Sequence, residues 1–295
     1  MHQWTCNDTR EFIRGVKAMR ISIIVPVRSD LKAFFELMDS IRQTIKIPEE
    51  IEIIAGFDND DRVFAFCASA LQQEYKGLNL EFHRRDRSEY FSRDYWNWLA
   101  KKATGRWIVN VALGCKFLTD GWDEIIRSKM GCHAEKFGDD LVHGLIKDNI
   151  PRHGEDPKFP HFSCHPVVSK KHIDILGYLF DERNWAWGCD QCVTILYKAL
   201  NVILNQDRRV SLTDVAIFAE KDIHTMTQMD WDNIAKDLDI LPTPQSTEFI
   251  IKVLRHQNKS YQKFLRISDQ HPYSMSPEDA LKEAHKLADH IRGKK

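Results

Sequence analysis

The sequence predicts an α/β fold in which helices flank a mostly parallel central sheet. Between residues 20 and 112, short runs of β-branched and aliphatic residues alternate with segments whose apolar residues recur at helical spacing. The first run, RISIIVPV at residues 20–27, is almost continuously apolar, as in a strand that is buried on both faces. Strands that alternate with helices favour parallel pairing through right-handed crossovers.

The first strand and helix show both patterns in chain order. The strand at residues 20–27 contains Pro26 near its end, and residues 30–45 follow with a helical pattern. The apolar positions of that helix are Leu31, Phe34, Phe35, Met38, Ile41 and Ile45. The alternation continues as strand 51–57, helix 61–75, strand 78–83, helix 90–103 and strand 106–112.

Less regular patterns follow residue 120. We expect a short helix at 120–130, a strand at 140–146 and a long loop at 149–162, then a strand at 163–168, a helix from residue 170, a helix at 190–200 and a strand at 210–218. Charged, amphipathic helices at 248–264 and 277–291 would form a C-terminal helical appendage. The predicted division is an N-terminal extension at 1–19, a main domain at 20–244 and the appendage at 245–295.

Composition and charge exclude several classes of protein. The 295 residues are 43% hydrophobic and 29% charged, which is ordinary for a globular chain. The net charge of -1 gives no overall field that would attract nucleic acid or an anionic membrane. The sequence contains no apolar run long enough for a transmembrane segment, and its first residues do not form a signal peptide. Since its 7 scattered cysteines do not form a secreted disulfide framework, we expect a cytoplasmic protein with reduced thiols.

Polar side chains follow the second predicted strand at the point where it ends. In parallel α/β sheets, ligands bind beyond the carboxyl ends of the strands. Asp58, Asp60 and Asp61 lie there, and a carboxylate at such a place accepts hydrogen bonds from a base or from ribose hydroxyls. The alternative for Asp61 is that it caps the helix that begins next.

Several blocks of the sequence are similar to family 2-like glycosyltransferases with the GT-A fold. In order, these are ISIIVPVRSD, EIIAGFDNDD, NWLAKKATGRWIVNV, GWDEII and HPVVSKKHIDILGYLFDERNWAWGCDQ. The resemblance covers roughly residues 20 to 200 and implies a GT-A (Rossmann-like) fold. It also implies a nucleotide-sugar donor and a glycan or other hydroxyl acceptor.

The resemblance assigns donor contacts to five positions. Pro26 and Arg28 would border the nucleotide, Asp58 would contact the base, and Asp60 would lie near the ribose. Asn97 would face the donor from its helix.

The resemblance also assigns the reaction centre. Asp190, in WGCDQ, would be the base that deprotonates the acceptor hydroxyl as it attacks the anomeric carbon with inversion. The alternative is that Asp190 caps the following helix. Trp185 and Trp187 are candidates for acceptor contact, because an aromatic face stacks on the apolar face of a sugar, against the alternative of packing in the core.

One motif of the family is absent. Where its members carry an Asp-x-Asp or Asp-Asp pair that holds a divalent cation, Mn or Mg, this chain has VALGCK at residues 111–116. Hard cations require oxygen ligands, so the cation is either held differently or unnecessary. Lys116 would supply a fixed positive charge in its place, or is an ordinary solvated lysine. His224 stands near the position of the family's late metal-binding histidine.

The cysteines allow a different class of site. Cys189 and Cys192 have metal-like spacing, and His161, Cys164 and His165 would complete a zinc site if the loop folded over them. Buried thiols are the simpler alternative. The sequence therefore predicts a glycosyltransferase, with two alternatives: a catalytically silent GT-A-like protein that binds a nucleotide or glycan, and a zinc-stabilised interaction module.

Overall fold

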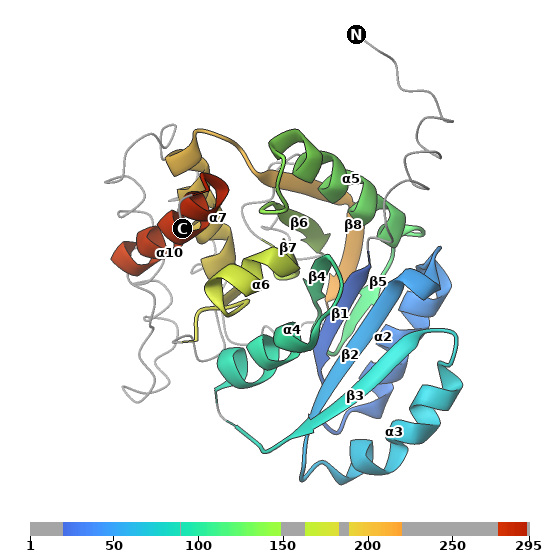
Figure 1. Ribbon diagram of the computed structural model, residues 1–295. Coiled ribbons are helices and arrows are strands. Elements are labelled where there is room, and N and C mark those ends of the chain that lie inside the picture. The colour runs from blue at the N-terminus through green and yellow to red at the C-terminus, as the bar shows by residue number, and fades with distance from the viewer. Residues whose placement is uncertain (1–19, 89, 149–162, 183–188, 220–276, 294–295) are drawn as a thin grey trace, which may run out of the picture.

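The computed structural model describes residues 20–88, 90–148, 163–182, 189–219 and 277–293. They form an eight-stranded sheet in the order β3-β2-β1-β4-β7-β6-β8-β5, with helices on both faces (Figure 1). The strands are β1 Ile21–Pro26, β2 Ile51–Asp58, β3 Asn79–Arg85, β4 Trp107–Asn110, β5 Cys115–Phe117, β6 His143–Asp148, β7 Pro166–Ser169 and β8 Arg209–Ala219. The helices are α2 Leu31–Thr44, the 3-10 helix η1 Pro48–Glu50, α3 Arg62–Glu74, the π-helix η2 Ser92–Asn97, α4 Trp98–Lys102, α5 Trp122–Phe137, α6 Lys170–Leu176, α7 Cys189–Leu204 and α10 Pro277–Ile291.

The sheet has a parallel half and a mixed half. Parallel pairing joins β3, β2, β1 and β4, as the alternating pattern predicted. Beyond β4, β7 runs antiparallel to both of its neighbours, β6 pairs parallel with β8, and β5 closes the edge antiparallel to β8. The mostly parallel α/β fold is therefore confirmed, and the order of strands reverses between β1 and β4.

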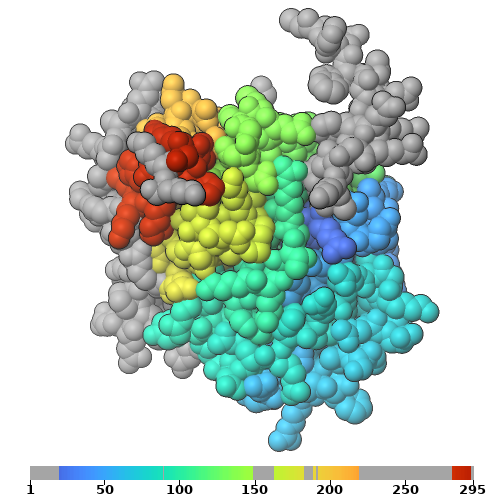
Figure 2. All heavy atoms as spheres, in the orientation of Figure 1, coloured from blue at the N-terminus to red at the C-terminus, as the bar shows by residue number. Residues whose placement is uncertain are grey.

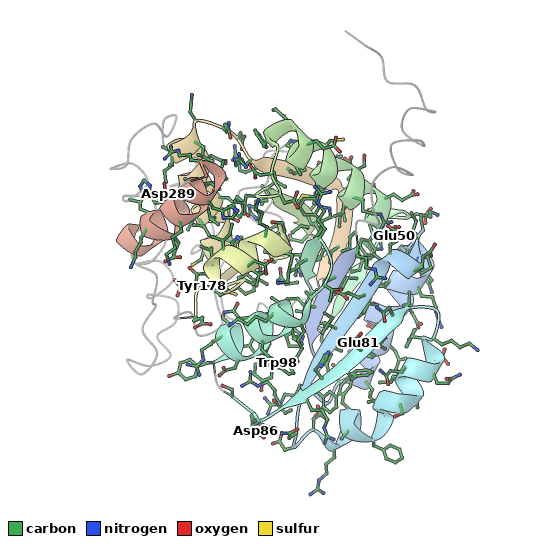
Figure 3. All side chains as sticks on the ribbon, viewed as in Figure 1. Glu50, Glu81, Asp86, Trp98, Tyr178 and Asp289 are labelled. Atoms are coloured by element: carbon green, nitrogen blue, oxygen red, sulfur yellow. The ribbon has the colours of Figure 1, made fainter. Side chains whose placement is uncertain are left out.

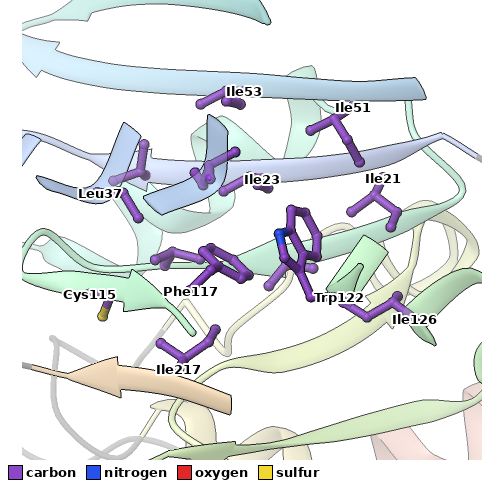
Figure 4. Close-up of a cluster of buried hydrophobic side chains, with 14 of the residues drawn as sticks. Ile21, Ile23, Leu37, Ile51, Ile53, Cys115, Phe117, Trp122, Ile126 and Ile217 are labelled. Atoms are coloured by element: carbon purple, nitrogen blue, oxygen red, sulfur yellow. The ribbon is translucent and has the colours of Figure 1, made fainter. Parts of the chain in front are cut away.

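Two hydrophobic clusters fill the two faces of the sheet. Alternate residues of β1 point to opposite faces, so Ile23 belongs to one cluster and Ile24 to the other. The first cluster packs α2, α3 and α5 onto the sheet, and Trp122 of α5 lies within it beside Phe117 of β5 (Figure 4). The second cluster packs α4, α6, α7 and α10 onto the opposite face.

The helix α10 lies against the rest of the molecule. It packs on α7 and α6, and Figure 2 shows its red surface beside the yellow surface of α6. Ala284, Leu287 and Ala288 are fully buried there and belong to the same hydrophobic cluster as α6 and α7. The helix expected as an appendage thus contributes to the core of the main fold.

Three elements differ from the sequence prediction. The helix α5 ends at Phe137, further along than expected, and β5 was not predicted as a strand. The helix expected at 90–103 begins with a π-helical turn before α4. The predicted loop at 149–162 and helix at 248–264 lie outside the described residues. Within the described part of the chain, no helix is long and apolar enough to cross a membrane.

Candidate functional site

Polar residues from both halves of the sheet gather at one edge. The strands β1, β2, β4 and β6 end there, and the antiparallel strands β7 and β5 begin there. The order of strands reverses between β1 and β4, which is where α/β sheets open a crevice for ligands. We call this the carboxyl edge of the sheet.

The loop that follows β1 is fixed through its backbone. The Val27 N–H donates to the Gly56 carbonyl at 2.8 Å, just after the buried Pro26. Ser29 has a positive φ of 49° and its N–H donates to Asp61 Oδ2 at 2.7 Å. Arg28 is exposed between these anchors, and its side chain makes no ion pair with the described residues. The loop therefore carries an exposed cation at the carboxyl edge.

Asp61 has a structural role. Its Oδ1 accepts from the backbone N–H groups of Val63 and Phe64, both at 3.1 Å, which caps α3. Its other oxygen holds Ser29. The capping alternative for this residue is therefore confirmed.

Asp58 and Asp60 have different partners. Asp58 is 2% exposed, and its Oδ1 accepts a hydrogen bond from the Tyr95 hydroxyl. Asp60 is exposed and forms an ion pair with Arg87, with 2.9 Å between Nη2 and Oδ2. The Arg87 Nε also lies 3.7 Å from Asp58 Oδ2. Asp58 and Asp60, which were predicted to contact the base and the ribose, thus lie near each other, and Arg87 approaches both carboxylates.

The π-helix places Tyr95 over the end of β2. Its hydroxyl accepts from the Ser88 N–H at 3.1 Å and donates to Asp58. Burial raises the pKa of Tyr95, and the hydrogen bond to Asp58 raises it further, so the hydroxyl keeps its proton. The next turn approaches β2 closely, because a Cβ on Gly56 would lie 2.7 Å from the Trp98 ring, which extends from α4 toward this part of the sheet (Figure 3). π-helical turns are frequent at functional sites.

Asn97 differs from its predicted role. Its side chain is fully buried; its Oδ1 accepts from the N–H groups of Leu179 and Phe180 at 2.9 and 2.8 Å, and its Nδ2 donates to the Phe180 carbonyl at 2.7 Å. The amide is used within the fold, so it holds the chain after α6 in place and does not face a donor.

The segment at residues 111–116 forms a turn followed by β5. Gly114 has a φ of 83°, and the Cys115 N–H points to the Ala112 carbonyl at 3.4 Å. The Lys116 Nζ lies 3.0 Å from Glu36 Oε2, so its charge is paired with α2. No carboxylate belongs to this turn.

The described residues contain no group of three His, Cys, Asp or Glu side chains that could hold a metal ion. Cys189 and Cys192 are buried at the start of α7, as the simpler alternative predicted. Burial raises the pKa of the Cys189 thiol well above its usual value. The described residues therefore contain no set of ligands for the zinc site that the cysteine spacing allowed. His161 and His224 lie outside the described residues.

A second polar cluster lies beyond the point where the strand order reverses, at His165. Its Nδ1 is 3.2 Å from the Asn110 carbonyl and its Nε2 is 3.6 Å from Cys115 Sγ. Burial lowers the pKa of His165, but the Cys115 sulfur, the charge of Asp148 and the Asn110 carbonyl together raise it to about 9. The cluster thus stabilises a buried positive charge at the end of β4.

Asp190 lies in the first turn of α7, partly exposed beside this cluster. Burial raises the pKa of the Cys164 thiol, and the charge and hydrogen bond of Asp190 raise it further, which places the carboxylate next to Cys164. Since Asp190 is inside the helix, it is not the residue that precedes and caps it. Trp185 and Trp187 lie outside the described residues.

Three residues of the carboxyl edge were not predicted. Asp148 ends β6, and the same strand-end rule would have identified it if that strand had been extended by two residues. Tyr95 and Arg87 reach Asp58 from beyond β3, and no local pattern indicates that contact.

Comparison with known proteins supports the fold. The chain matches no protein-family model and no curated protein. Among solved structures, it is similar to S. aureus TarS residues 1–349 in complex with UDP, at 16% identity and a TM-score of 0.55, over 94% of this chain and 83% of that one. A longer S. aureus TarS structure matches over 50% of its length.

A second similar structure is the mannosyltransferase PcManGT from Pyrobaculum calidifontis in complex with GDP-Man and Mn2+. The identity is 15% and the TM-score 0.50, over 92% of this chain and 69% of that one. Together with the strand order, these likenesses show that the chain has the GT-A fold.

Proposed function

We propose that this protein transfers a sugar from a nucleotide-sugar donor to an acceptor hydroxyl. The observation that carries the proposal is the position of Asp58 and Asp190. The first lies at the end of β2 and the second at the start of α7, on opposite sides of the point between β1 and β4 where the strand order reverses. Structures with the same fold are described as complexes with UDP, UDP-GlcNAc and GDP-Man, which supports a donor of this class.

The residues at each end of the carboxyl edge have a part in the proposed reaction. Asp58 accepts from the base, Asp60 from the ribose, and the exposed Arg28 pairs with the diphosphate, because carboxylates accept and guanidinium groups donate to phosphate. Asp190 accepts the proton of the acceptor hydroxyl. The acceptor oxygen bonds to the anomeric carbon as the bond to the diphosphate breaks, and the leaving group takes that electron pair. Attack from the opposite face inverts the anomeric centre.

We also propose that transfer does not depend on a divalent cation. The turn at residues 111–116 offers no carboxylate ligand, and a protein cation near a leaving diphosphate lowers the same barrier. Arg28 is an exposed cation at the carboxyl edge without an ion pair among the described residues, whereas Lys116 is paired with Glu36. We expect a chelator to leave the transfer rate unchanged. A rate that requires added manganese would contradict metal independence and leave the transferase proposal intact.

The role of Asp190 is tested by Asp190→Asn. The amide keeps the size of the side chain but cannot accept the proton, so transfer should fall by roughly 10²- to 10⁴-fold while donor binding is retained. The matched control is Asp174→Asn, which removes an exposed carboxylate of α6 that pairs with Lys170. Transfer by Asp190→Asn at the wild-type rate would exclude this residue as the base. Donor binding without transfer by the wild type would favour the silent binding protein.

A further inference from the structure

We infer that Cys164 is a positioning residue for the proposed base, because its thiol donates a hydrogen bond to the Asp190 carboxylate and holds it in the direction in which it meets the acceptor hydroxyl. The inference rests on the proposed function of Asp190, and it gives a role to a thiol that the proposed mechanism does not use.

The backbone around Cys164 is fixed on both sides. The Ser163 hydroxyl is fully buried; it donates to the Ile146 carbonyl of β6 at 3.0 Å and accepts from the His165 N–H at 3.1 Å. On the other side, the Asn110 Nδ2 donates to the Cys164 carbonyl at 3.2 Å, and the Asn110 carbonyl lies 3.2 Å from His165 Nδ1. These contacts tie the segment to β6 and β4, so the side chain of Cys164 extends from a fixed backbone.

The Asp190 carboxylate approaches this thiol from α7. Asp190 is the second residue of α7, and the helix packs in the second hydrophobic cluster through Val193 and Leu196. The helix backbone is therefore fixed, but an aspartate side chain still rotates about its own bonds, and Asp190 is only half-buried. A hydrogen bond from an anchored neighbour gives the carboxylate one direction, and Cys164 supplies such a bond.

The proton of this hydrogen bond belongs to the thiol. Burial, and then the charges of Asp190 and Asp148, raise the pKa of the Cys164 thiol well above its usual value, and Cys115 adds a smaller effect in the same direction. The thiol therefore keeps its proton at neutral pH, whereas an ionised carboxylate can only accept. Donation from sulfur to Asp190 favours the ionised carboxylate, which is the form that a base requires.

The variants Cys164→Ala and Cys164→Ser separate the hydrogen bond from the packing of the sulfur. Both remove the sulfur atom, but only serine restores an atom that can donate. Without this bond the ionised carboxylate is less stable, so the acidic limb of the pH profile of kcat/KM should move up by roughly half a pH unit to one pH unit in Cys164→Ala. The kcat should fall about 10-fold, because the carboxylate loses its direction, while the KM for the nucleotide-sugar should change less than about 2-fold. In Cys164→Ser, the limb should return to the wild-type pH or below it, and most of kcat should return.

The matched control is Cys132→Ala. It removes an exposed thiol of α5, which packs on the opposite face of the sheet from α7, and it should leave kcat, KM and the acidic limb as in the wild type.

A titration of the carboxyl group tests the same contact without turnover. In protein labelled with carbon-13 at the aspartate carboxyl carbons, the NMR resonance of Asp190 is the one that is missing from Asp190→Asn. The pH midpoint of this resonance should be higher in Cys164→Ala than in the wild type, and it should return in Cys164→Ser.

The outcomes separate this inference from the proposed function. An Asp190 resonance with the same midpoint in the wild type and in Cys164→Ala would overturn the inference, even if Asp190→Asn abolishes transfer and the proposed function stands. A loss of kcat in Cys164→Ala that Cys164→Ser does not restore would also overturn it. If the midpoint shifts as expected but the wild type transfers no sugar, Cys164 still holds Asp190 and the transferase proposal fails.

Discussion

Three buried histidines in the same half of the sheet have two opposite kinds of surroundings. His165 lies at the carboxyl edge, with the Asn110 carbonyl at 3.2 Å and Cys115 Sγ at 3.6 Å. These partners, with Asp148, outweigh burial and raise its pKa to about 9. His143 is at the opposite end of β6 and is fully buried, and neither of its ring nitrogens has a hydrogen-bond partner among the described residues.

His143 and His172 belong to a stack of three rings. Tyr197 of α7 lies between His143 and His172, with ring centroids 5.1 and 5.7 Å apart. Burial lowers the pKa of His143 to about 3, and burial lowers that of His172 to about 4. Both imidazoles are therefore neutral at pH 7, and they act as flat, mainly apolar surfaces.

The comparison shows that burial alone does not decide the charge of a histidine. Burial opposes the imidazolium in both places, and the result depends on whether acceptors and negative charges surround the ring. At the carboxyl edge they do, and this edge is where a charged substrate is proposed to bind. In the ring stack, a backbone hydrogen bond at Leu179 raises the pKa of His172 but does not outweigh burial, so the same residue type serves as packing.

The largest expected effect is on stability in acid. The folded pKa values of His143 and His172 lie below the ordinary 6.5, so the unfolded chain binds protons that the folded chain does not. The free energy of unfolding should therefore decrease as the pH falls below 6.5. For the two residues together, we expect a loss of roughly 4–5 kcal/mol between pH 7 and pH 4.5.

The variant His143→Phe tests whether the loss of stability in acid comes from the ring stack. It keeps a flat ring against Tyr197, removes one titrating group and breaks no hydrogen bond to the described residues. Urea unfolding at several pH values should show a slope smaller by about 1.4 kcal/mol per pH unit below pH 6. A slope equal to that of the wild type would mean that His143 is not kept neutral by the fold.

The next effect is at alkaline pH and has the opposite sign. The folded pKa of His165 is raised, so its contribution to stability is complete below pH 6.5 and is lost as the pH rises to about 9. Over this range we expect a loss of roughly 3 kcal/mol, which His165→Gln should remove from the pH profile. Unfolding measured from pH 6 to pH 9.5 tests this, and His143→Phe, which should retain the alkaline loss, is the control.

A smaller effect is expected when the sulfur beside His165 is removed. Cys115→Ala takes away a partner of Nε2 but leaves the Asn110 carbonyl and Asp148, so the pKa of His165 should fall without reaching that of His143. The stability at pH 7 should decrease by about 1 kcal/mol. NMR titration of the imidazole follows the change directly, and an unaltered titration would show that Asp148 and Asn110 alone sustain the charge.

The parallel half of the fold was predictable because its signals are local. A buried strand, the polar residues that end it and the helix that follows are adjacent in the chain, so residues 20–112 gave the order of elements and the positions of Arg28 and Asp58. The strand β5 was missed because three residues show no periodicity.

The contacts between distant segments were not predictable. Asn97 was assigned to the donor by resemblance, but its amide binds Leu179 and Phe180, which lie more than 80 positions away in the sequence. The pKa of His165 is raised by Cys115 and Asp148, which lie in other strands; Cys115 is 50 positions away in the sequence. No local sequence pattern indicates these long-range contacts, because each of the segments has the pattern of an ordinary strand or helix.

An effect no larger than that of Cys115→Ala is expected at the centre of the ring stack. The Tyr197 hydroxyl lies 3.3 Å from His172 Nδ1, and it is the polar contact that the stack makes within itself. Tyr197→Phe keeps both ring contacts and should destabilise the protein by about 1 kcal/mol at pH 7, because a buried nitrogen loses its partner. The acid slope should stay as in the wild type, since the burial that lowers both histidine pKa values is unchanged. A variant that loses several kcal/mol, or whose acid slope disappears, would show that the hydroxyl, and not burial, keeps the two imidazoles neutral.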